Sequence, residues 1–286
     1  MIRRSLALML TVVGANVAEA QCGPAVLRQI NQHQFEAART QLEAQLARDA
    51  KDDATMNCLG RLLLEKGETE RAVDWLEKAV AANGKSAQHH MWYGLALRAK
   101  ANQGNMFTQM TAGPKIKAEL EQAVSMDPTL VDARAVLLQL YLMAPAAMGG
   151  SVEAAREQAA GMMKVNPVRG QMGLAAIAEQ EKGPVAAEKA FLAGIAARPD
   201  SEVAYSAAGS FYRRQERWAD AIAMYEKQLK AMPKDSPVIR VSNAHYNLGL
   251  AQLKAGQPNR AKAEFRAANA ANPDNENAKK ALASVP

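Results

Sequence analysis

The chain has 286 residues, of which 49% are hydrophobic but only 5% aromatic, and its formal net charge is +6. This length fits two ordinary domains or one continuous repeat array, and the alanine-rich apolar content favours helices over strands. Because the charges are interspersed rather than gathered in a basic stripe with stacking aromatics, we do not expect nucleic-acid binding.

The first 20 residues have the three parts of a secretory signal. Arg3 and Arg4 form a positive start, residues 5–13 form a short apolar run, and Ala18-Glu19-Ala20 offers small residues for a signal peptidase. We expect cleavage after Ala20, leaving a periplasmic or secreted chain of residues 21–286. The apolar run is shorter than the roughly 20 residues that span a bilayer, and no other apolar segment of the sequence approaches that length. We therefore expect no stable membrane insertion after cleavage. An uncleaved anchor is the alternative.

A repeat of about 34 residues dominates the remaining chain, since Gly60 and Gly94 are 34 residues apart, as are Pro199 and Pro233. The clearest copy contains Tyr205, Ala208-Gly209, Tyr212, Ala221, Tyr225 and Pro233. Its successor contains His245, Leu248-Gly249, Ala261, Phe265 and Pro273, and an earlier copy contains Met56, Leu59-Gly60, Ala72 and Leu76. Weaker copies fill the middle. Phe35, Ala38 and Leu42 predict the second helix of a leading hairpin whose first helix begins near Pro24, and residues 275–284 predict a polar capping helix.

The spacing of these residues has a direct physical meaning. Positions 4, 7, 8 and 11 of each copy lie on one helical face. The small Gly and Ala let two helices approach closely, and a large residue such as Phe265 fills the space beside them. Proline ends the second helix, because the residue before it avoids helical angles.

These residues resemble the tetratricopeptide repeat (TPR), whose pattern is W-x2-L-G-x2-Y, then A-x3-F, then P. Tyr205, Ala208 and Tyr225 replace its Trp, Leu and Phe, whereas Gly209, Tyr212, Ala221 and Pro233 match. The resemblance covers roughly residues 24–284. It implies an all-α, right-handed superhelical solenoid of helix-turn-helix hairpins, about seven in number with a degenerate first one, followed by a capping helix.

Two segments interrupt the period. One surplus falls near residues 99–114 and the other near residues 144–151, where the Ala-Pro…Gly-Gly-Ser segment is similar to a loop in a subgroup of exported bacterial TPR proteins. We interpret the second as a packed connector in which Ser151 caps the next helix; a lip of the binding groove is the alternative. For Met106, Phe107 and Met110 we expect core packing rather than an adaptable interface.

The two cysteines, Cys22 and Cys58, would lie on the first helices of adjacent hairpins. An oxidising compartment permits a disulfide between them, and two separate thiols are the alternative. Lipidation of Cys22 is disfavoured, because Glu19 and Gln21 suit a lipobox poorly.

No catalytic constellation is found, so we expect neither an enzyme nor a cofactor. The nucleophile-elbow, P-loop and zincin motifs are absent from the sequence. His89 and His90 point about 100° apart on a helix and cannot readily hold one metal together. His245 is expected to pack against the partner helix of its hairpin.

The TPR resemblance places a ligand on the concave surface that the first helices make. The positions that face it in this chain are Asn57, Arg61, Gln88, Arg98, Gln139, Arg213, Arg214, Asn243, Tyr246 and Lys254. This set is basic overall, and arginine binds carboxylates bidentately. We therefore expect a protein or peptide ligand with acidic character, bound by an adaptor or scaffold of the cell envelope. A solvated polar face, or an exported solenoid that binds a small molecule or metal, is the alternative.

Overall fold

Fifteen α-helices and one short 3-10 helix follow one another along the described part of the chain, which contains no strand. The computed structural model describes residues 22–32, 34–104, 106–234, 236, 238–273 and 275–285. The expected signal, residues 1–20, lies outside them. The helices are α2 (Pro24–Asn31), α3 (Phe35–Arg48), α4 (Asp53–Glu65), α5 (Thr69–Ala82), α6 (Ala87–Gln103), α7 (Met106–Met126), α8 (Val131–Met143), η1 (Ala146–Met148), α9 (Val152–Val165), α10 (Pro167–Lys182), α11 (Pro184–Ala197), α12 (Glu202–Arg214), α13 (Trp218–Ala231), α14 (Val238–Lys254), α15 (Pro258–Ala271) and α16 (Glu276–Ser284).

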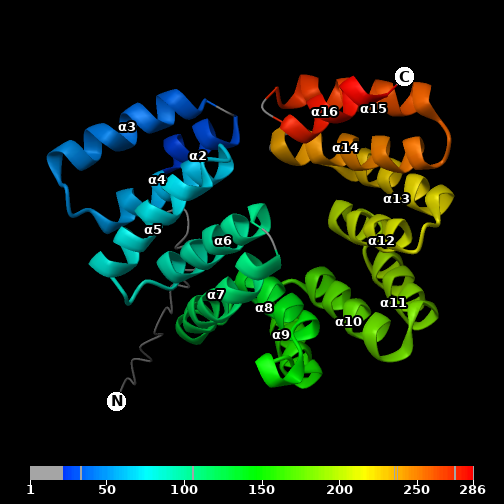
Figure 1. The fold of residues 1–286 in the computed structure, drawn as a ribbon, viewed down its shortest axis with the longest axis horizontal. Coiled ribbons are helices and arrows are strands. Elements are labelled where there is room, and N and C mark those ends of the chain that lie inside the picture. The colour runs from blue at the N-terminus through cyan, green and yellow to red at the C-terminus, as the bar shows by residue number, and fades with distance from the viewer. Residues whose placement is uncertain are drawn as a thin grey trace, which may run out of the picture.

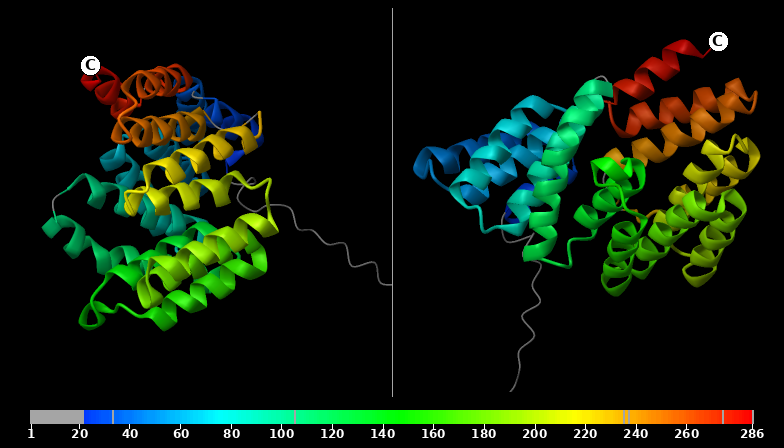
Figure 2. Two further views of the ribbon diagram at one scale, coloured as in Figure 1. Left: turned by 90° about the vertical axis from the view of Figure 1, so that its right-hand side faces the viewer. Right: turned by 60° about the horizontal axis from the view of Figure 1, so that its bottom comes forward.

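The described helices pair as seven hairpins, from α2/α3 to α14/α15, and α16 follows the last one. Figure 1 shows the hairpins stacked side by side along a curved path, so that the first and last hairpins face each other across the molecule. Figure 2 shows the same stack from two further sides, with α16 at one outer end. The predicted all-α solenoid of hairpins is thereby confirmed over the described residues.

Most of the first helices are preceded by a residue whose side chain caps the start of the helix. The side chains of Asp52, Ser86, Asn166 and Ser201 accept hydrogen bonds from backbone N–H groups three residues later, at the starts of α4, α6, α10 and α12. The second helices α5, α13 and α15 have no side-chain cap and instead follow tight turns. In two of these turns Gly67 and Gly256 have a φ of 83° and 74°, but the third turn places Glu216 at a φ of 56°.

The core lies where the two helices of each hairpin touch. A Cβ atom added to Gly60 would lie 2.4 Å from Leu76, and one added to Gly249 would lie 2.7 Å from Phe265. Ala72 and Ala261 are fully buried at the facing helix positions. The predicted close approach of the paired helices is therefore confirmed, and it explains why the repeat requires small residues at these positions.

The two period breaks have different structures. The first lengthens α6 to 17 residues and α7 to 21, and α7 includes Pro114 in its interior. The side chains of Met106, Phe107 and Met110 lie outside the described part of the structure. The second break forms η1, after which Gly149 has a φ of 85° and Ser151 caps α9 by accepting the Ala154 N–H at 3.1 Å. The predicted Ser151 cap is confirmed.

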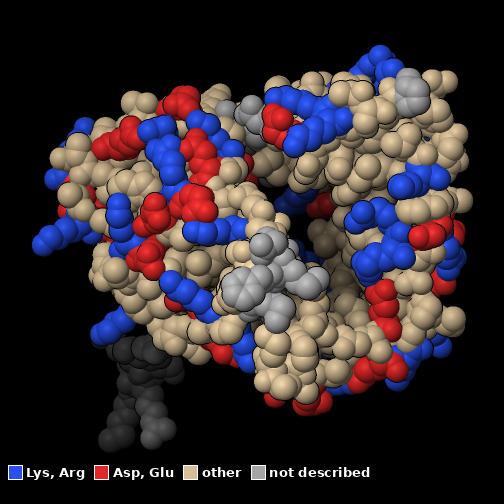
Figure 3. All heavy atoms as spheres, in the orientation of Figure 1, with Lys and Arg blue, Asp and Glu red and all other residues tan. Residues whose placement is uncertain are grey.

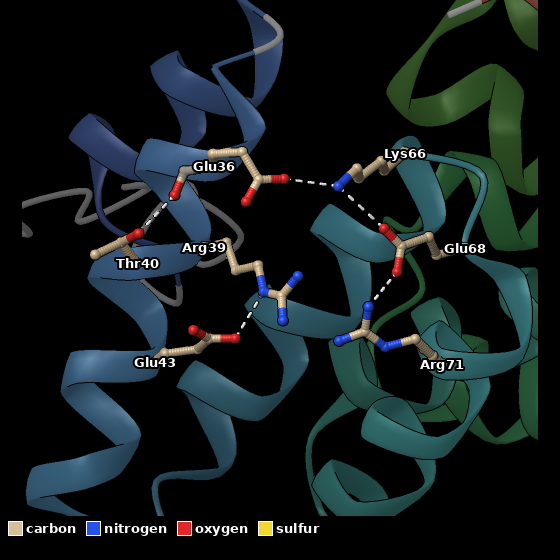
Figure 4. A network of polar contacts seen from close by, with 7 residues as sticks. All are labelled: Glu36, Arg39, Thr40, Glu43, Lys66, Glu68 and Arg71. Atoms are coloured by element: carbon tan, nitrogen blue, oxygen red, sulfur yellow. Dashed lines mark hydrogen bonds and ion pairs between the residues drawn. The ribbon is translucent and has the colours of Figure 1, made fainter.

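Polar contacts also link neighbouring hairpins on the outer surface. Figure 4 shows one such network, in which Lys66 bridges Glu36 of α3 and Glu68 before α5, with Nζ–O distances of 2.7 and 3.1 Å. Arg39 pairs with Glu43 and Arg71 with Glu68 in the same network. These side chains are all at least partly exposed to solvent, so each pair contributes little to stability.

Candidate functional site

A cavity of about 630 Å³ opens on the surface that the first helices make. Figure 3 shows a hollow between the N-terminal and C-terminal halves, with basic and acidic side chains interspersed around it. The walls of the cavity come from first helices of four consecutive hairpins and include Leu138 and Gln139 of α8, Arg169, Met172 and Gly173 of α10, Val203, Ser206, Ser210 and Arg214 of α12, and Ile239, Arg240, Asn243 and Asn247 of α14.

Three arginine side chains that line this cavity are each held in place by an acidic neighbour. Each arginine forms an ion pair with an acid on the preceding first helix: Arg169 with Asp132 at 2.7 Å, Arg214 with Glu179 at 2.6 Å and Arg240 with Glu202 at 2.9 Å. We call these three pairs the arginine ladder. Only one of the three acids, Glu202, itself lines the cavity, although all three acids offset the charge of their arginine.

The arginine ladder leaves hydrogen-bonding capacity for a ligand. A guanidinium has five N–H donors, and the pairs of Arg169 and Arg240 each use one of them with the partner acid. Arg214 and Arg240 are about half exposed, at 52% and 53% of the side chain. The geometry therefore suits recognition of a carboxylate by groups that the fold holds in place.

A second cavity of about 260 Å³ lies where the two ends of the solenoid face each other. It is lined by Ile30 and Asn31 of α2, Arg61 and Glu65 of α4, Asp132 of α8, and Ile239 and Arg240 of α14. Burial lowers the pKa of Arg61 and raises the pKa of Glu65, while the attraction between the two charges opposes both shifts. The Arg61 guanidinium also lies over the Trp92 ring, 4.7 Å from its centroid. Arg240 lines both cavities and connects them.

The structure brings some of the residues predicted for the groove together. Gln139, Arg214 and Asn243 line the large cavity, and Arg61 lines the second one. Arg98 donates a hydrogen bond to Gln139 across the gap between α6 and α8, at 2.5 Å. These five residues therefore occupy one continuous surface on the first helices.

Other predicted residues lie elsewhere. Arg213 and Lys254 are exposed but line neither cavity, and Tyr246 packs its ring 5.9 Å from that of Phe265. Asn57 and Gln88 are only 1% and 7% exposed, in contrast to the surface positions expected for them. The first helices that carry them, α4 and α6, contact each other, and both positions are buried rather than open to a ligand.

Sequence reasoning missed several cavity residues. Arg169 and Arg240 lie near the N-terminal ends of α10 and α14, before the positions that the repeat pattern assigns to the groove. Gln228 lines the cavity from α13, a second helix, which the pattern assigns to packing. An arginine 35 to 38 residues after an acid, repeated three times, is the signal that was available in the sequence.

The two cysteines are joined as a disulfide, with Cα atoms 5.3 Å apart, and both are buried, at 5% and 0% exposed for Cys22 and Cys58. The bond ties the residues before α2 to α4 and thereby fixes the first hairpin on the second.

The histidines take part in separate contacts. His89 contacts Asp53 at 2.7 Å, His90 contacts Glu119 at 2.6 Å, and His245 contacts Glu264 of the facing helix α15 at 2.7 Å. Within the described residues, no group of three or more His, Cys, Asp or Glu side chains is arranged to hold a metal ion. None of the described helices has both the length and the apolar character needed to cross a membrane.

Seven stacked hairpins with a groove on their first helices define a helical-repeat solenoid. Two family models of the tetratricopeptide repeat match the chain, over residues 56–86 and 212–285. No curated protein matches it in sequence. The chain therefore contains tetratricopeptide repeats.

Solved structures of TPR proteins share the fold. The chain is similar to a tetratricopeptide repeat protein from Parabacteroides merdae, at 16% identity and a TM-score of 0.58, covering 93% of this chain and 98% of that one. It is also similar to yeast Tom70, at 13% identity and a TM-score of 0.64, over 99% of this chain but only 59% of Tom70. A thermophilic TPR protein from Thermus thermophilus matches at 17% identity and a TM-score of 0.50, over 82% of this chain and 99% of that one. The predicted right-handed TPR solenoid is confirmed as the fold class.

Proposed function

We propose that this protein is a non-catalytic scaffold of the cell envelope, which binds a segment of another protein in the large cavity. A TPR fold suggests a protein–protein interaction scaffold. The observation that carries the choice of site is the arginine ladder, which holds three guanidinium groups along a cavity with a largely apolar floor. The partner segment carries carboxylates, because the guanidinium groups of the arginine ladder keep N–H donors that their own acids do not use.

The envelope location rests on two features of the chain. Residues 1–20 have the pattern of a secretory signal, and the Cys22–Cys58 disulfide suits an oxidising compartment, where such bonds persist. Fractionation of cells that produce the full chain tests this location. We expect the protein in the periplasmic or extracellular fraction with Gln21 at its N-terminus. Retention in the cytoplasm with an intact N-terminus would reject export.

Differential affinity capture tests the binding site. The mature chain is immobilised as wild type, Arg214→Gln and Arg213→Gln, and proteins retained from an envelope extract are quantified by mass spectrometry. Arg214 lines the cavity whereas the adjacent and equally charged Arg213 does not, so the pair is a matched control. We expect a partner that wild type and Arg213→Gln retain and that Arg214→Gln loses. Equal recovery of the partner on all three proteins would show that it binds outside the cavity.

The second candidate function is binding of a small molecule. The volume of about 630 Å³ lies within the range of ligand pockets, which is roughly 300–1,000 Å³. Native mass spectrometry of the protein purified from its own cells distinguishes the two. A stoichiometric bound mass below about 1 kDa that Arg214→Gln lacks would favour the small molecule over the peptide.

A further inference from the structure

The large cavity extends below the layer of first helices. Besides its walls on α8, α10, α12 and α14, it is lined by Met162 of α9, Phe191 of α11 and Gln228 of α13, which are second helices. All three of these side chains are buried, at 2%, 4% and 4% exposed. The cavity therefore reaches second helices as well as first helices, and Phe191 marks the part that lies behind α10 and α12.

Small residues keep this pocket open. Gly173 and Ala176 of α10 and Ser206 and Ala207 of α12 line it. At Gly173 even an added Cβ would lie 2.7 Å from Leu138 and 3.0 Å from Met162. The space beside Gly173 is therefore filled by the chain's own Leu138 and Met162. The short side chains of Ala176, Ser206 and Ala207 leave room in the rest of the cavity for a bulky side chain from outside.

Gln228 places an unusual polar group in this pocket. The residue is 4% exposed, and its buried Oε1 has no hydrogen-bond partner among the described residues. An unpaired buried acceptor is costly, and a donor from a ligand would satisfy it. Gln252 is a natural comparison, because it is 1% exposed and its Oε1 is also unpaired, yet it lines neither cavity.

Charge surrounds the mouth of the pocket. Arg214 of α12 and Arg240 of α14 line the same cavity as Gln228 and are about half exposed. Apolar side chains with one unpaired acceptor, beside half-exposed arginines, fit a peptide, which offers backbone N–H donors next to both apolar and acidic side chains.

We infer that the partner inserts one large aliphatic or aromatic side chain between α10 and α12, while its backbone donates a hydrogen bond to Gln228 Oε1 and an adjacent carboxylate binds Arg214 or Arg240. This inference rests on the proposed function and names the kind of segment that the site selects: an extended acidic peptide with an apolar anchor residue.

A positional-scanning library of acetylated nonapeptides tests this anchor pocket, with binding to the mature protein measured by fluorescence anisotropy. We expect selection of Leu, Ile, Met or Phe at one position, with Asp or Glu within a few residues of it. Replacing the anchor by alanine should weaken binding about tenfold or more, because the buried methylene groups are lost. The Gln228→Met variant should bind about fivefold more weakly, since it removes one acceptor, whereas Gln252→Met should bind as wild type does.

A second experiment fills the pocket with a large side chain of the protein itself and repeats the peptide binding. Ser206→Phe should abolish selection for the apolar anchor, whereas Ala219→Phe, at an exposed position that lines neither cavity, should not. Circular dichroism and a melting curve show that each variant is folded. Acidic peptides that bind through Arg214 without apolar preference, equally to Ser206→Phe, would overturn the anchor pocket and leave the proposed function intact. Failure of every peptide to bind would overturn both.

Discussion

Arg214 of α12 donates a hydrogen bond to Glu179 of α10 at 2.6 Å, although 35 residues separate the two in sequence. The contact joins the first helices of consecutive hairpins at the edge of the large cavity. The same relationship recurs between Arg169 and Asp132. Side chains that could bind a ligand are thus already held in place by their neighbours, which reduces the ordering entropy that binding costs.

The Arg214 pair should matter more for binding than for stability. The arginine side chain is 52% exposed, and exposed pairs contribute about 0–1 kcal/mol. We expect Arg214→Gln to lower the free energy of unfolding by less than about 1 kcal/mol in urea titrations while it weakens binding of acidic peptides. A large loss of stability with unchanged peptide binding would contradict the expectation that Arg214 acts mainly in binding.

Glu216 should be replaced by glycine with a gain in stability. Its φ of 56° is in the left-handed region, where the equivalent turns use Gly67 and Gly256. A non-glycine residue costs about 1–2 kcal/mol in this conformation, part of which the flexibility of glycine in the unfolded chain offsets. We expect Glu216→Gly to raise stability by about 0.5–1 kcal/mol in thermal unfolding. Glu216→Ala is the control, and an equal gain from it would reject the backbone explanation.

The contact of Gly60 with Leu76 predicts that alanine destabilises the protein more at Gly60 than at Gly113, another helical glycine. A Cβ at Gly60 would lie 2.4 Å from Leu76 Cγ, and Leu76 is fully buried, so it cannot shift freely. We expect Gly60→Ala to cost about 1–3 kcal/mol by overpacking. At Gly113, inside α7, an added Cβ meets nothing within 4 Å. Alanine has the higher helix propensity, but the ring of Pro114 crowds a Cβ on the preceding helical residue. We therefore expect Gly113→Ala to change stability by less than about 1 kcal/mol, and the melting temperatures of the two variants measure the difference.

The Cys22–Cys58 disulfide closes a loop across 36 positions and should stabilise the N-terminal hairpins. Reduction of the wild type should cost about 2–4 kcal/mol and lower the melting temperature. The double variant Cys22→Ala/Cys58→Ala should melt at the lower temperature whether or not reductant is present. A wild type whose melting does not respond to reductant would show that the bond contributes nothing.

His89 predicts a loss of stability in mild acid. Burial lowers the pKa of His89 below its ordinary 6.5, and the hydrogen bond with Asp53 only partly opposes this. Above pH 6.5 the imidazole is neutral in both states, so its full contribution is present. As the pH falls through 6.5, the unfolded chain takes up the proton first and stability declines. Chemical unfolding between pH 5 and 8 measures this slope, which His89→Gln should reduce. An unchanged slope in that variant would assign the acid sensitivity to other groups.

Much of the fold was predictable because its determinants are local. Gly249 and Phe265, or Gly60 and Leu76, lie in the same hairpin, so their 16-residue spacing alone brings the helices together. The Ser151 cap is local in the same way. By contrast, Asn57 and Gln88 share the surface pattern of their repeat but are buried in the folded protein. No property of one repeat predicts how closely it packs on the next.

The sequence by itself determined the hairpins, their number and order and the chemistry available on the first helices, because a 34-residue repeat specifies the contacts within each hairpin and makes each hairpin stack on its neighbours in sequence. Only the tertiary structure decided that Arg240 joins two cavities, that Gln228 reaches the large one from a second helix, and that Arg61 lies opposite α14. These relationships depend on the small rotation between successive hairpins, summed over the whole solenoid. That rotation is set by how side chains pack at each junction, and the repeat pattern does not encode it.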